Sequence, residues 1–363
     1  MNTSKIVCLA AGVIAAAALA HGNGISFTCA PDVDAAVAGT CNYLNSIIAS
    51  QYSSTFSNAN AVIYVQYGTT ALASSTTGFD NQVTYGNYVA ALTANASKDG
   101  IDISALAALA SFDNTPYGGG NVDLTSALAS ALGISGEVIG GIAGTTATGV
   151  SCDTPGVSGC YNGIITMSNA PGTWFFDNSV GPELSTQYDF YGALEHETDE
   201  LLGTSSCIST MQSPLIDNCP GVSTPSAADL FRYSSAGQLV LDSSLSTTPG
   251  AYFSYNGGAT NGANGIGGSP KFYNTLDNGD DYADFVSSSP NCATNQAVQD
   301  AEGCAGADTG VFITNDGGAE INILNAVGYD LLNPGPSTPE PSTLALLGVS
   351  LAFLAFFVRR ARV

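Results

Sequence analysis

The sequence predicts an α+β fold, because segments with helical spacing of apolar residues are mixed with short runs of β-branched and aromatic residues. Residues 33–57 place apolar side chains, among them Leu44 and Ile47, at helical spacing. Residues 61–67 read Ala-Val-Ile-Tyr-Val-Gln-Tyr, which is the composition of a strand. A later segment that ends in Leu-Leu-Gly at residues 201–203 has the pattern of a helix closed by glycine.

The other elements are expected at short intervals along the chain. Glycines and small residues hide the period of residues 122–150, which therefore stay unassigned. In chain order, the sequence predicts helices over 81–97 and 104–111, strands over 163–168 and 173–176, a helix from 185 or 186 to 202, strands over 238–241 and 251–255, a loop over 257–268 and a helix over 320–331.

The N-terminus has the features of a secretory signal peptide. Lys5 precedes an apolar run from Ile6 to Leu19, and small residues surround position 20, where cleavage is expected. Residues 1–20 are therefore interpreted as a signal for export across the inner membrane, and residues 21–332 as the folded ectodomain.

The C-terminus combines three ordered features. A Pro-rich linker over 333–342 contains Pro-Glu-Pro at 339–341, an apolar run of about 15 residues follows within 343–363, and arginines end the chain. The run is short for a permanent span of roughly 20 residues, and the arginines would hold that end on the cytoplasmic side. These features resemble the PEP-CTERM sorting signal of Gram-negative bacteria. The resemblance implies an exosortase-type sorting enzyme as a partner, transient C-terminal anchoring in the inner membrane, and a final place at the cell surface or outside the cell. A simple tail anchor is the alternative.

The charge of the chain excludes one class of partner. Residues 21–342 hold three basic and all 30 acidic side chains, which gives a net charge near −27. Such a surface repels nucleic acid and anionic membranes and keeps an exported protein soluble. We therefore expect no nucleic-acid binding.

The cysteines are consistent with an oxidising compartment. Once Cys8 of the signal peptide is set aside, eight cysteines remain in four sequential couples, separated by 12, 8, 12 and 12 residues. Nearest-neighbour disulfides are the favoured pairing, with a cysteine-rich zinc site as the alternative, although no C-x2-C spacing occurs. The expected pairs are Cys29–Cys41, Cys152–Cys160, Cys207–Cys219 and Cys292–Cys304.

Histidine and glutamate are scarce, yet they are concentrated on one predicted helix. The chain has two histidines, of which His21 lies at the edge of the signal peptide. Of eight glutamates, Glu195, Glu197 and Glu200 lie within four residues of His196. His196 and Glu200 project from the same helix face, because they are four residues apart. Hydrolytic zinc needs ligands that leave a position open for water, and a carboxylate to take the proton of that water.

This pattern makes His196 and Glu200 candidate zinc ligands and Glu197 the candidate general base. A solvated acidic helix face is the alternative. The motif His-Glu-x-x-Glu followed by Leu-Leu-Gly, together with the order of elements before it, resembles zincin metalloproteases. It is similar in particular to secreted, PEP-CTERM-tagged bacterial proteins predicted to be metalloproteases. The resemblance extends loosely over 188–192, 229–233 and 323–330, and implies a zincin-like catalytic domain with an active-site helix and disulfide-stapled loops, acting on protein or peptide substrates.

The chain departs from the usual zincin motif, His-Glu-x-x-His, because position 200 is glutamate. The third histidine of the longer metzincin motif would fall at Ser206. No histidine follows His196, so we expect a carboxylate as third ligand, and Asp229 is the choice because it lies in an apolar, aromatic segment beside Arg232. A structural ion pair between Asp229 and Arg232 is the alternative.

A second cluster of oxygen donors suits calcium without matching the EF-hand spacing. It comprises Asp277, Asp280, Asp281 and Asp284, and a merely solvated acidic loop is the alternative. Other chemistries fit less well, since a copper site at His21 would need a further histidine and no Gly-x-Ser-x-Gly elbow occurs. The sequence therefore predicts a secreted zinc-dependent endopeptidase, or alternatively a non-catalytic extracellular matrix or surface-adhesion protein sorted by an exosortase.

Overall fold

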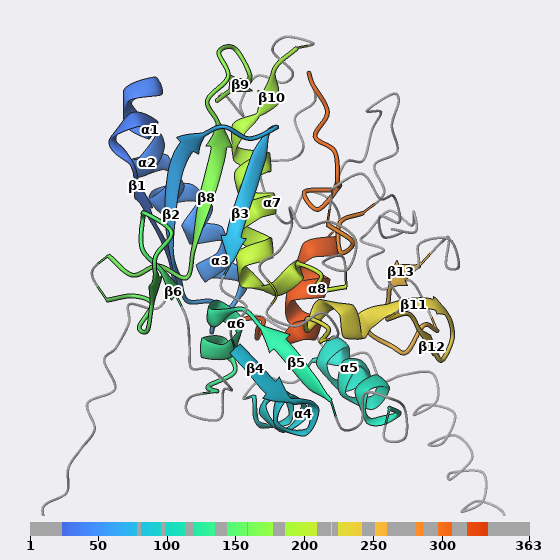
Figure 1. Ribbon diagram of the computed structural model, residues 1–363. Coiled ribbons are helices and arrows are strands. Elements are labelled where there is room, and N and C mark those ends of the chain that lie inside the picture. The colour runs from blue at the N-terminus through green and yellow to red at the C-terminus, as the bar shows by residue number, and fades with distance from the viewer. Residues whose placement is uncertain are drawn as a thin grey trace, which may run out of the picture.

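A four-stranded sheet with helices packed on one of its faces forms the centre of the computed structural model (Figure 1). Strands β1 (Ile25–Cys29), β2 (Ala61–Gly68) and β8 (Gly163–Ser168) are parallel, and β3 (Ala73–Thr77) lies antiparallel to β8 at one edge. The α+β class is thus confirmed. The structure describes residues 24–77, 81–95, 99–112, 120–134, 144–157, 159–176, 186–208, 219, 224–241, 251–259, 281–285, 297–306 and 318–332.

The alternation of side chains along β2 explains why helices cover one face of the sheet. Ala61, Ile63 and Val65 are buried, whereas Val62 and Tyr64 between them are partly exposed. Successive residues of a strand point to opposite faces, so the buried set marks the face that meets the helices.

Four consecutive helical pieces occupy the segment expected to be one helix over 33–57. They are α1 (Pro31–Ala36), α2 (Thr40–Tyr43), the π-helical turn η1 (Leu44–Ile48) and α3 (Ala49–Thr55). The prediction is confirmed in outline. It missed the break before α2, where Gly39 has a φ of 88°, in the left-handed region that glycine tolerates best.

The remaining elements are short. They are β4 (Asn81–Thr84), α4 (Tyr85–Ala94), α5 (Gly100–Ala110), β5 (Asn121–Leu124), α6 (Ser126–Ala131), β6 (Gly144–Thr145), β7 (Ser151–Cys152), β9 (Trp174–Phe175), β10 (Tyr188–Asp189), α7 (Phe190–Asp199), η2 (Glu200–Thr204), η4 (Ala228–Phe231), β11 (Arg232–Ser235), β12 (Gln238–Leu239), β13 (Tyr252–Phe253) and α8 (Ala319–Val327).

Two predicted helices begin later than their sequence patterns indicated. Residues 81–84 form β4, which pairs with β5, so α4 begins only after Thr84. Helix α7 begins after β10, where the Asp189 carboxylate accepts a hydrogen bond from the backbone N–H of Tyr191 at 2.9 Å. Such a capping side chain satisfies a donor that the first turn leaves unpaired. Helical spacing alone therefore overestimated both helices at their N-termini.

Helix α7 packs against the sheet and against α3, and its end is set by glycine. The Tyr52 hydroxyl of α3 donates to Asp199 at 2.8 Å. Gly203 has a φ of 124°, and a Cβ at this position would lie 3.1 Å from a methyl carbon of Leu128. The predicted closure of this helix by Gly203 is confirmed, and both its backbone angle and its close neighbour favour glycine.

Three of the four predicted disulfides are present between described residues. They link Cys29 to Cys41, Cys152 to Cys160, and Cys207 to Cys219. Cys304 is also disulfide-bonded, whereas Cys292, its predicted partner, lies outside the described residues. Nearest-neighbour pairing is therefore confirmed wherever both partners are described.

The two predicted sorting segments, residues 1–20 and 343–363, also lie outside the described residues. Within the ranges that the structure describes, none of the helices is long and apolar enough to cross a membrane.

The contact between α3 and α7 gives a first prediction. Tyr52→Phe removes a hydroxyl that is fully buried and donates to Asp199, so the carboxylate loses a partner where water cannot replace it. We expect the free energy of unfolding to fall by about 1–3 kcal/mol. Tyr64→Phe, on the partly exposed side of β2, is the control and should change it by less than about 0.5 kcal/mol. Chemical denaturation measures both, and equal stability of the two variants would contradict the assigned hydrogen bond.

Candidate metal centre

The His196 ring is fixed by the backbone on one side and faces two carboxylates on the other. Its Nδ1 lies 2.9 Å from the carbonyl oxygen of Val298. Because a carbonyl can only accept, Nδ1 carries the proton of the neutral ring and Nε2 keeps its lone pair. Nε2 lies 3.6 Å from Oε1 of Glu200 and 3.5 Å from Oδ1 of Asp284. This orientation, with the second ring nitrogen bound to a carbonyl, is the usual one for a metal-ligating histidine.

The three facing atoms have the spacing of ligands around one small cation. Two atoms that each lie 2.0–2.2 Å from a tetrahedral zinc are about 3.4 Å apart. One ligand atom each from His196, Glu200 and Asp284 lies within 4.8 Å of the other two. The separations of 3.5 and 3.6 Å from the histidine nitrogen are close to this tetrahedral value. The residues present therefore fit a zinc ion.

Electrostatics at this group favour a positive charge. Burial lowers the pKa of His196, but the charge of Asp284 and then the hydrogen bond and charge of Glu200 raise it overall, to well above its usual value. Two buried carboxylates beside one imidazole thus stabilise a cation at Nε2. A divalent metal ion would supply that charge in place of the proton.

Glu200 is held in place from the edge strand of the sheet. The Ser75 hydroxyl of β3 donates to Oε2 of Glu200 at 2.6 Å. Burial raises the pKa of Glu200, but the hydrogen bond and charge of His196, together with the Ser75 hydroxyl, bring it below the usual range. The carboxylate is therefore kept in the ionised form that binds metal.

Asp284 is supported by a separate chain of hydrogen bonds. The side-chain amide of Gln299 donates to Oδ1 of Asp284 at 3.0 Å, and its oxygen accepts from the Thr204 hydroxyl at 3.1 Å. Thr204 belongs to η2, the turn that continues α7. The support of Asp284 thus leads back to the same helix that carries His196.

Glu197 lies beside the group and lines a cleft together with His196. It is buried, and burial followed by the charge of Glu200 raises its pKa well above the usual value. The cleft has a volume of about 390 Å³ and lies between the start of β3, α7 and residues 297–304. Among its lining residues are His196, Glu197, Leu72 and Val298. A small molecule or an extended chain in this cleft would reach both His196 and Glu197.

Asp229, the third ligand predicted from the sequence, is not part of this group. Its carboxylate accepts hydrogen bonds from the Ser206 hydroxyl at 2.6 Å, the Cys207 N–H at 2.9 Å and the Ser226 N–H at 2.8 Å. Burial raises the pKa of Asp229, although these bonds and the charge of Arg232 oppose the shift. Arg232 itself donates to the carbonyl of Tyr282. Asp229 therefore holds the loop that follows η2.

The residues of the predicted calcium cluster have different roles. Asp284 faces His196, whereas the Asp281 carboxylate accepts from the backbone N–H groups of Ser206, at 2.9 and 3.1 Å, and Ala283, at 2.7 Å. Asp277 and Asp280, the other two predicted ligands, lie outside the described residues. The described part of this cluster thus contributes one carboxylate to the His196 group and uses the other to hold the loop.

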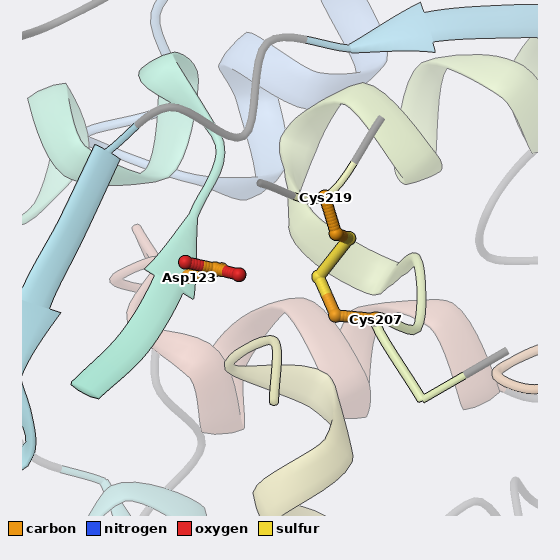
Figure 2. Close-up of side chains that lie close together, drawn as sticks. All are labelled: Asp123, Cys207 and Cys219. Atoms are coloured by element: carbon orange, nitrogen blue, oxygen red, sulfur yellow. A yellow bond between two sulfur atoms is a disulfide. The ribbon is translucent and has the colours of Figure 1, made fainter. Parts of the chain in front are cut away.

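A second set of metal-ligating residue types surrounds Asp123. Figure 2 shows this buried aspartate of β5 directed towards the disulfide between Cys207 and Cys219. Metal binding by cysteine requires the thiolate, and both sulfurs are here committed to the bond between them. The two sulfurs are therefore not available as metal ligands, and among the described residues the His196 group remains the candidate metal centre.

Several functional contacts carried no signal in the sequence. Ser75 is one serine in a chain rich in serine, and Val298 contributes only a backbone carbonyl. Asp284 did stand out through its acidic neighbours, but this pattern indicated calcium. Its distance of 88 residues from His196 in the sequence gave no reason to bring the two together.

Comparison with known proteins identifies one segment of the chain. Residues 337–361 match the model of the PEP-CTERM protein-sorting motif. This motif implies processing by an exosortase, and proteins that carry it are exported and sorted to the cell surface. No curated protein and no solved structure is significantly similar to the chain.

The third ligand can be tested with a matched pair of variants. Asp284→Asn should weaken zinc binding by more than the 10–100-fold that is typical when a supporting residue is lost, because it removes a charged donor. Asp229→Asn makes the same chemical change at a carboxylate that reaches the group only through the loop, so it should weaken zinc binding less than Asp284→Asn does, while lowering stability by about 1–3 kcal/mol. Titration of the metal-free protein with zinc measures both. The reverse ranking would restore Asp229 as the ligand.

The support of Glu200 gives a second test. Ser75→Ala removes the hydroxyl that orients this carboxylate, so zinc affinity should fall by roughly 10–100-fold. Ser74→Ala is the control, since Ser74 is the exposed neighbour on the opposite face of β3. Zinc titration should find the control unchanged, and an equally unchanged Ser75→Ala would remove Ser75 from the site.

Proposed function

We propose that this exported protein is a zinc-dependent hydrolase that cleaves peptide bonds. The observation that carries the proposal is the convergence of His196, Glu200 and Asp284, of which His196 lines one cleft together with Glu197. A histidine nitrogen in the set favours zinc over calcium or magnesium, which prefer sites built of oxygen ligands.

The ligand set would balance the metal charge. Glu200 and Asp284 supply two negative charges through one oxygen each, and neutral His196 supplies a nitrogen. Three protein ligands leave a fourth position for water or substrate. When bound, zinc would polarise the substrate carbonyl and lower the pKa of the attacking water. Two carboxylates reduce this effect relative to neutral imidazoles, so the reaction would depend more strongly on the general base.

Glu197 would provide that base. It would accept one proton from the attacking water as the oxygen bonds to the carbonyl carbon, and then deliver a proton to the leaving amine as the carbon–nitrogen bond breaks. Burial and the charge of Glu200 raise the pKa of Glu197, whereas the positive charge of a bound zinc would lower it and so leave the carboxylate ionised before the attack. The Ser75 hydroxyl and the Val298 carbonyl would keep Glu200 and His196 in position during both steps.

The edge of the sheet supports an extended peptide as substrate. Strand β3 is the last in the order β1-β2-β8-β3, and Leu72 and Ala73 at its start line the cleft. An edge strand can bind an extended chain through main-chain hydrogen bonds. A peptide that paired with β3 would pass next to His196 and Glu197.

A non-catalytic surface or matrix protein is the second candidate. The sorting motif at 337–361 favours it, because this motif accounts for export and surface location without any enzymatic activity. The comparisons also supply no related protease. In this case the His196 group would hold a structural metal or none.

Glu197→Gln separates the base from the ligands. The change removes the proton acceptor and leaves His196, Glu200 and Asp284 intact. Zinc content should therefore persist while hydrolysis of casein or peptides falls by roughly 10²–10⁴-fold. The control is Glu302→Gln, which makes the same change at an exposed position in the same cleft and should keep most of the activity.

The metal ligand itself provides the complementary experiment. His196→Ala removes the only imidazole of the group, so both bound zinc and hydrolysis should be lost. Elemental analysis and a peptide-cleavage assay on the same samples measure the two. A wild-type protein that binds zinc but cleaves none of a broad set of peptides would favour the surface-protein alternative.

A further inference from the structure

A second cavity lies where the parallel strands of the sheet end. It has a volume of about 380 Å³ and shares no lining residue with the cleft at His196. Its walls come from α1, from the last residues of β2, and from the turn that connects β8 to β9. In Figure 1 these segments meet at the end of the sheet towards which the arrows of β2 and β8 point. Open sheets with parallel strands commonly bind ligands outside the carboxyl ends of their strands.

One wall of this cavity, here called the strand-end pocket, is aromatic. Tyr67, Trp174 and Phe176 line it, and all three rings contact Phe190 at the start of α7, with centroid distances of 6.2, 5.6 and 4.6 Å. Phe190 is fully buried, so it anchors the rings from behind. The Trp174 N–H donates to the carbonyl of Ser168 at 2.8 Å, which fixes the indole and uses its polar atom internally. The three rings therefore form one apolar surface whose shape is set before a ligand binds.

The rest of the strand-end pocket offers polar groups to a ligand. Asp32 and Asn169 are exposed and Tyr67 is half-buried, and all three line the pocket. In the ranges that the structure describes, their side chains make no hydrogen bond with another residue. Burial, followed by the charge of Asp32, raises the pKa of Tyr67 to about 12, so its hydroxyl stays protonated. The pocket therefore presents a carboxylate acceptor, an amide and a phenol beside the aromatic wall.

We propose that the strand-end pocket binds a neutral saccharide unit of a glycan. A pyranose ring combines a face of C–H groups with hydroxyls around its rim, each of which donates and accepts hydrogen bonds. The aromatic wall can contact the C–H face, and Asp32, Asn169 and Tyr67 can form hydrogen bonds with the hydroxyls. The volume lies within the roughly 300–1,000 Å³ usual for small-molecule sites, which is enough for a mono- or disaccharide.

The negative charge of the pocket and of the chain favours neutral over acidic sugars. Asp32 is the ionisable acid of the pocket, and the whole chain carries a formal net charge of −23. Sugar acids would therefore be repelled. A quaternary ammonium ion could also bind aromatic rings beside a carboxylate. A neutral sugar fits better, because Asn169 and Tyr67, two of the three polar groups assigned above to the ligand, are uncharged hydrogen-bonding groups.

The chain contains its own probe for this site, because Trp174 is its single tryptophan. Neutral hexoses, N-acetylhexosamines and their disaccharides should be titrated into the full protein while the tryptophan fluorescence is recorded, with calorimetry as a second measure. We expect a saturable change for at least one of them and a weaker one for the corresponding uronic acid.

Two conservative variants locate the binding. Asn169→Ala and Tyr67→Phe should each raise the dissociation constant roughly five- to tenfold, the value of one hydrogen bond. Asp153→Asn, an exposed change elsewhere on the surface, is the control and should leave it unchanged. His196→Ala should also leave it unchanged, because the two cavities are separate. The far-UV spectrum of each variant, and its tryptophan emission without sugar, establish that it is folded.

Three results would overturn the proposal. The first is the absence of saturable binding for every neutral saccharide at millimolar concentration. The second is binding that Asn169→Ala and Tyr67→Phe leave unchanged, which would place the sugar elsewhere. The third is a fluorescence change with tetramethylammonium alone, which would assign the pocket to a cation. None of these outcomes depends on whether the His196 group is catalytic.

Discussion

The packing of helix α7 is the constraint on which the candidate metal centre depends. This helix is buried along most of its length, yet it carries ionisable groups on both its core side and its cleft side. A buried carboxylate is costly unless it has a partner. On the core side, Asp199 accepts a hydrogen bond from Tyr52 of α3. This contact helps to set the rotation of α7 about its axis, and that rotation directs His196 towards the cleft and Glu200 towards Ser75 and His196. The candidate metal centre therefore depends on the contacts that α7 makes with the core.

The loop after α7 positions the carboxylate of Asp284, which lies far along the chain from His196. Asp229 binds Ser206 and Cys207, and the backbone of Ser206 in turn binds Asp281. Asp281 lies three residues before Asp284, so this series of hydrogen bonds positions the segment that faces His196. The disulfide at Cys207 restricts the same loop. Asp229 is thus connected to the metal group through the loop, although its own oxygens are used elsewhere.

This arrangement explains how far the sequence could predict the fold and the site. Helical spacing placed His196 and Glu200 on one face, because that relation is local and depends only on the helix period. The strand over 163–168 was found at its observed bounds, since buried strands have a distinct composition. Asp284 and Ser75 could not be assigned, because their roles arise from tertiary contacts across 88 and 125 residues. For Asp229, an acidic residue in an apolar segment correctly indicated a partner, but the partners are backbone N–H and hydroxyl groups.

Helix α7 also relates the two proposed sites to each other. Phe190 in its first turn supports the aromatic wall of the strand-end pocket, and His196, six residues later, faces the cleft. Six residues along a helix correspond to roughly 9 Å, so the two sites are neighbours on one rigid element. Because Phe190 is fully buried among aromatic rings, a ligand in the pocket would meet a surface that is already formed. Such a ligand would have little conformational change to transmit. The geometry therefore favours two independent sites that helix α7 holds at a fixed separation. A glycan bound in the strand-end pocket would keep the protein beside the material that its cleft faces.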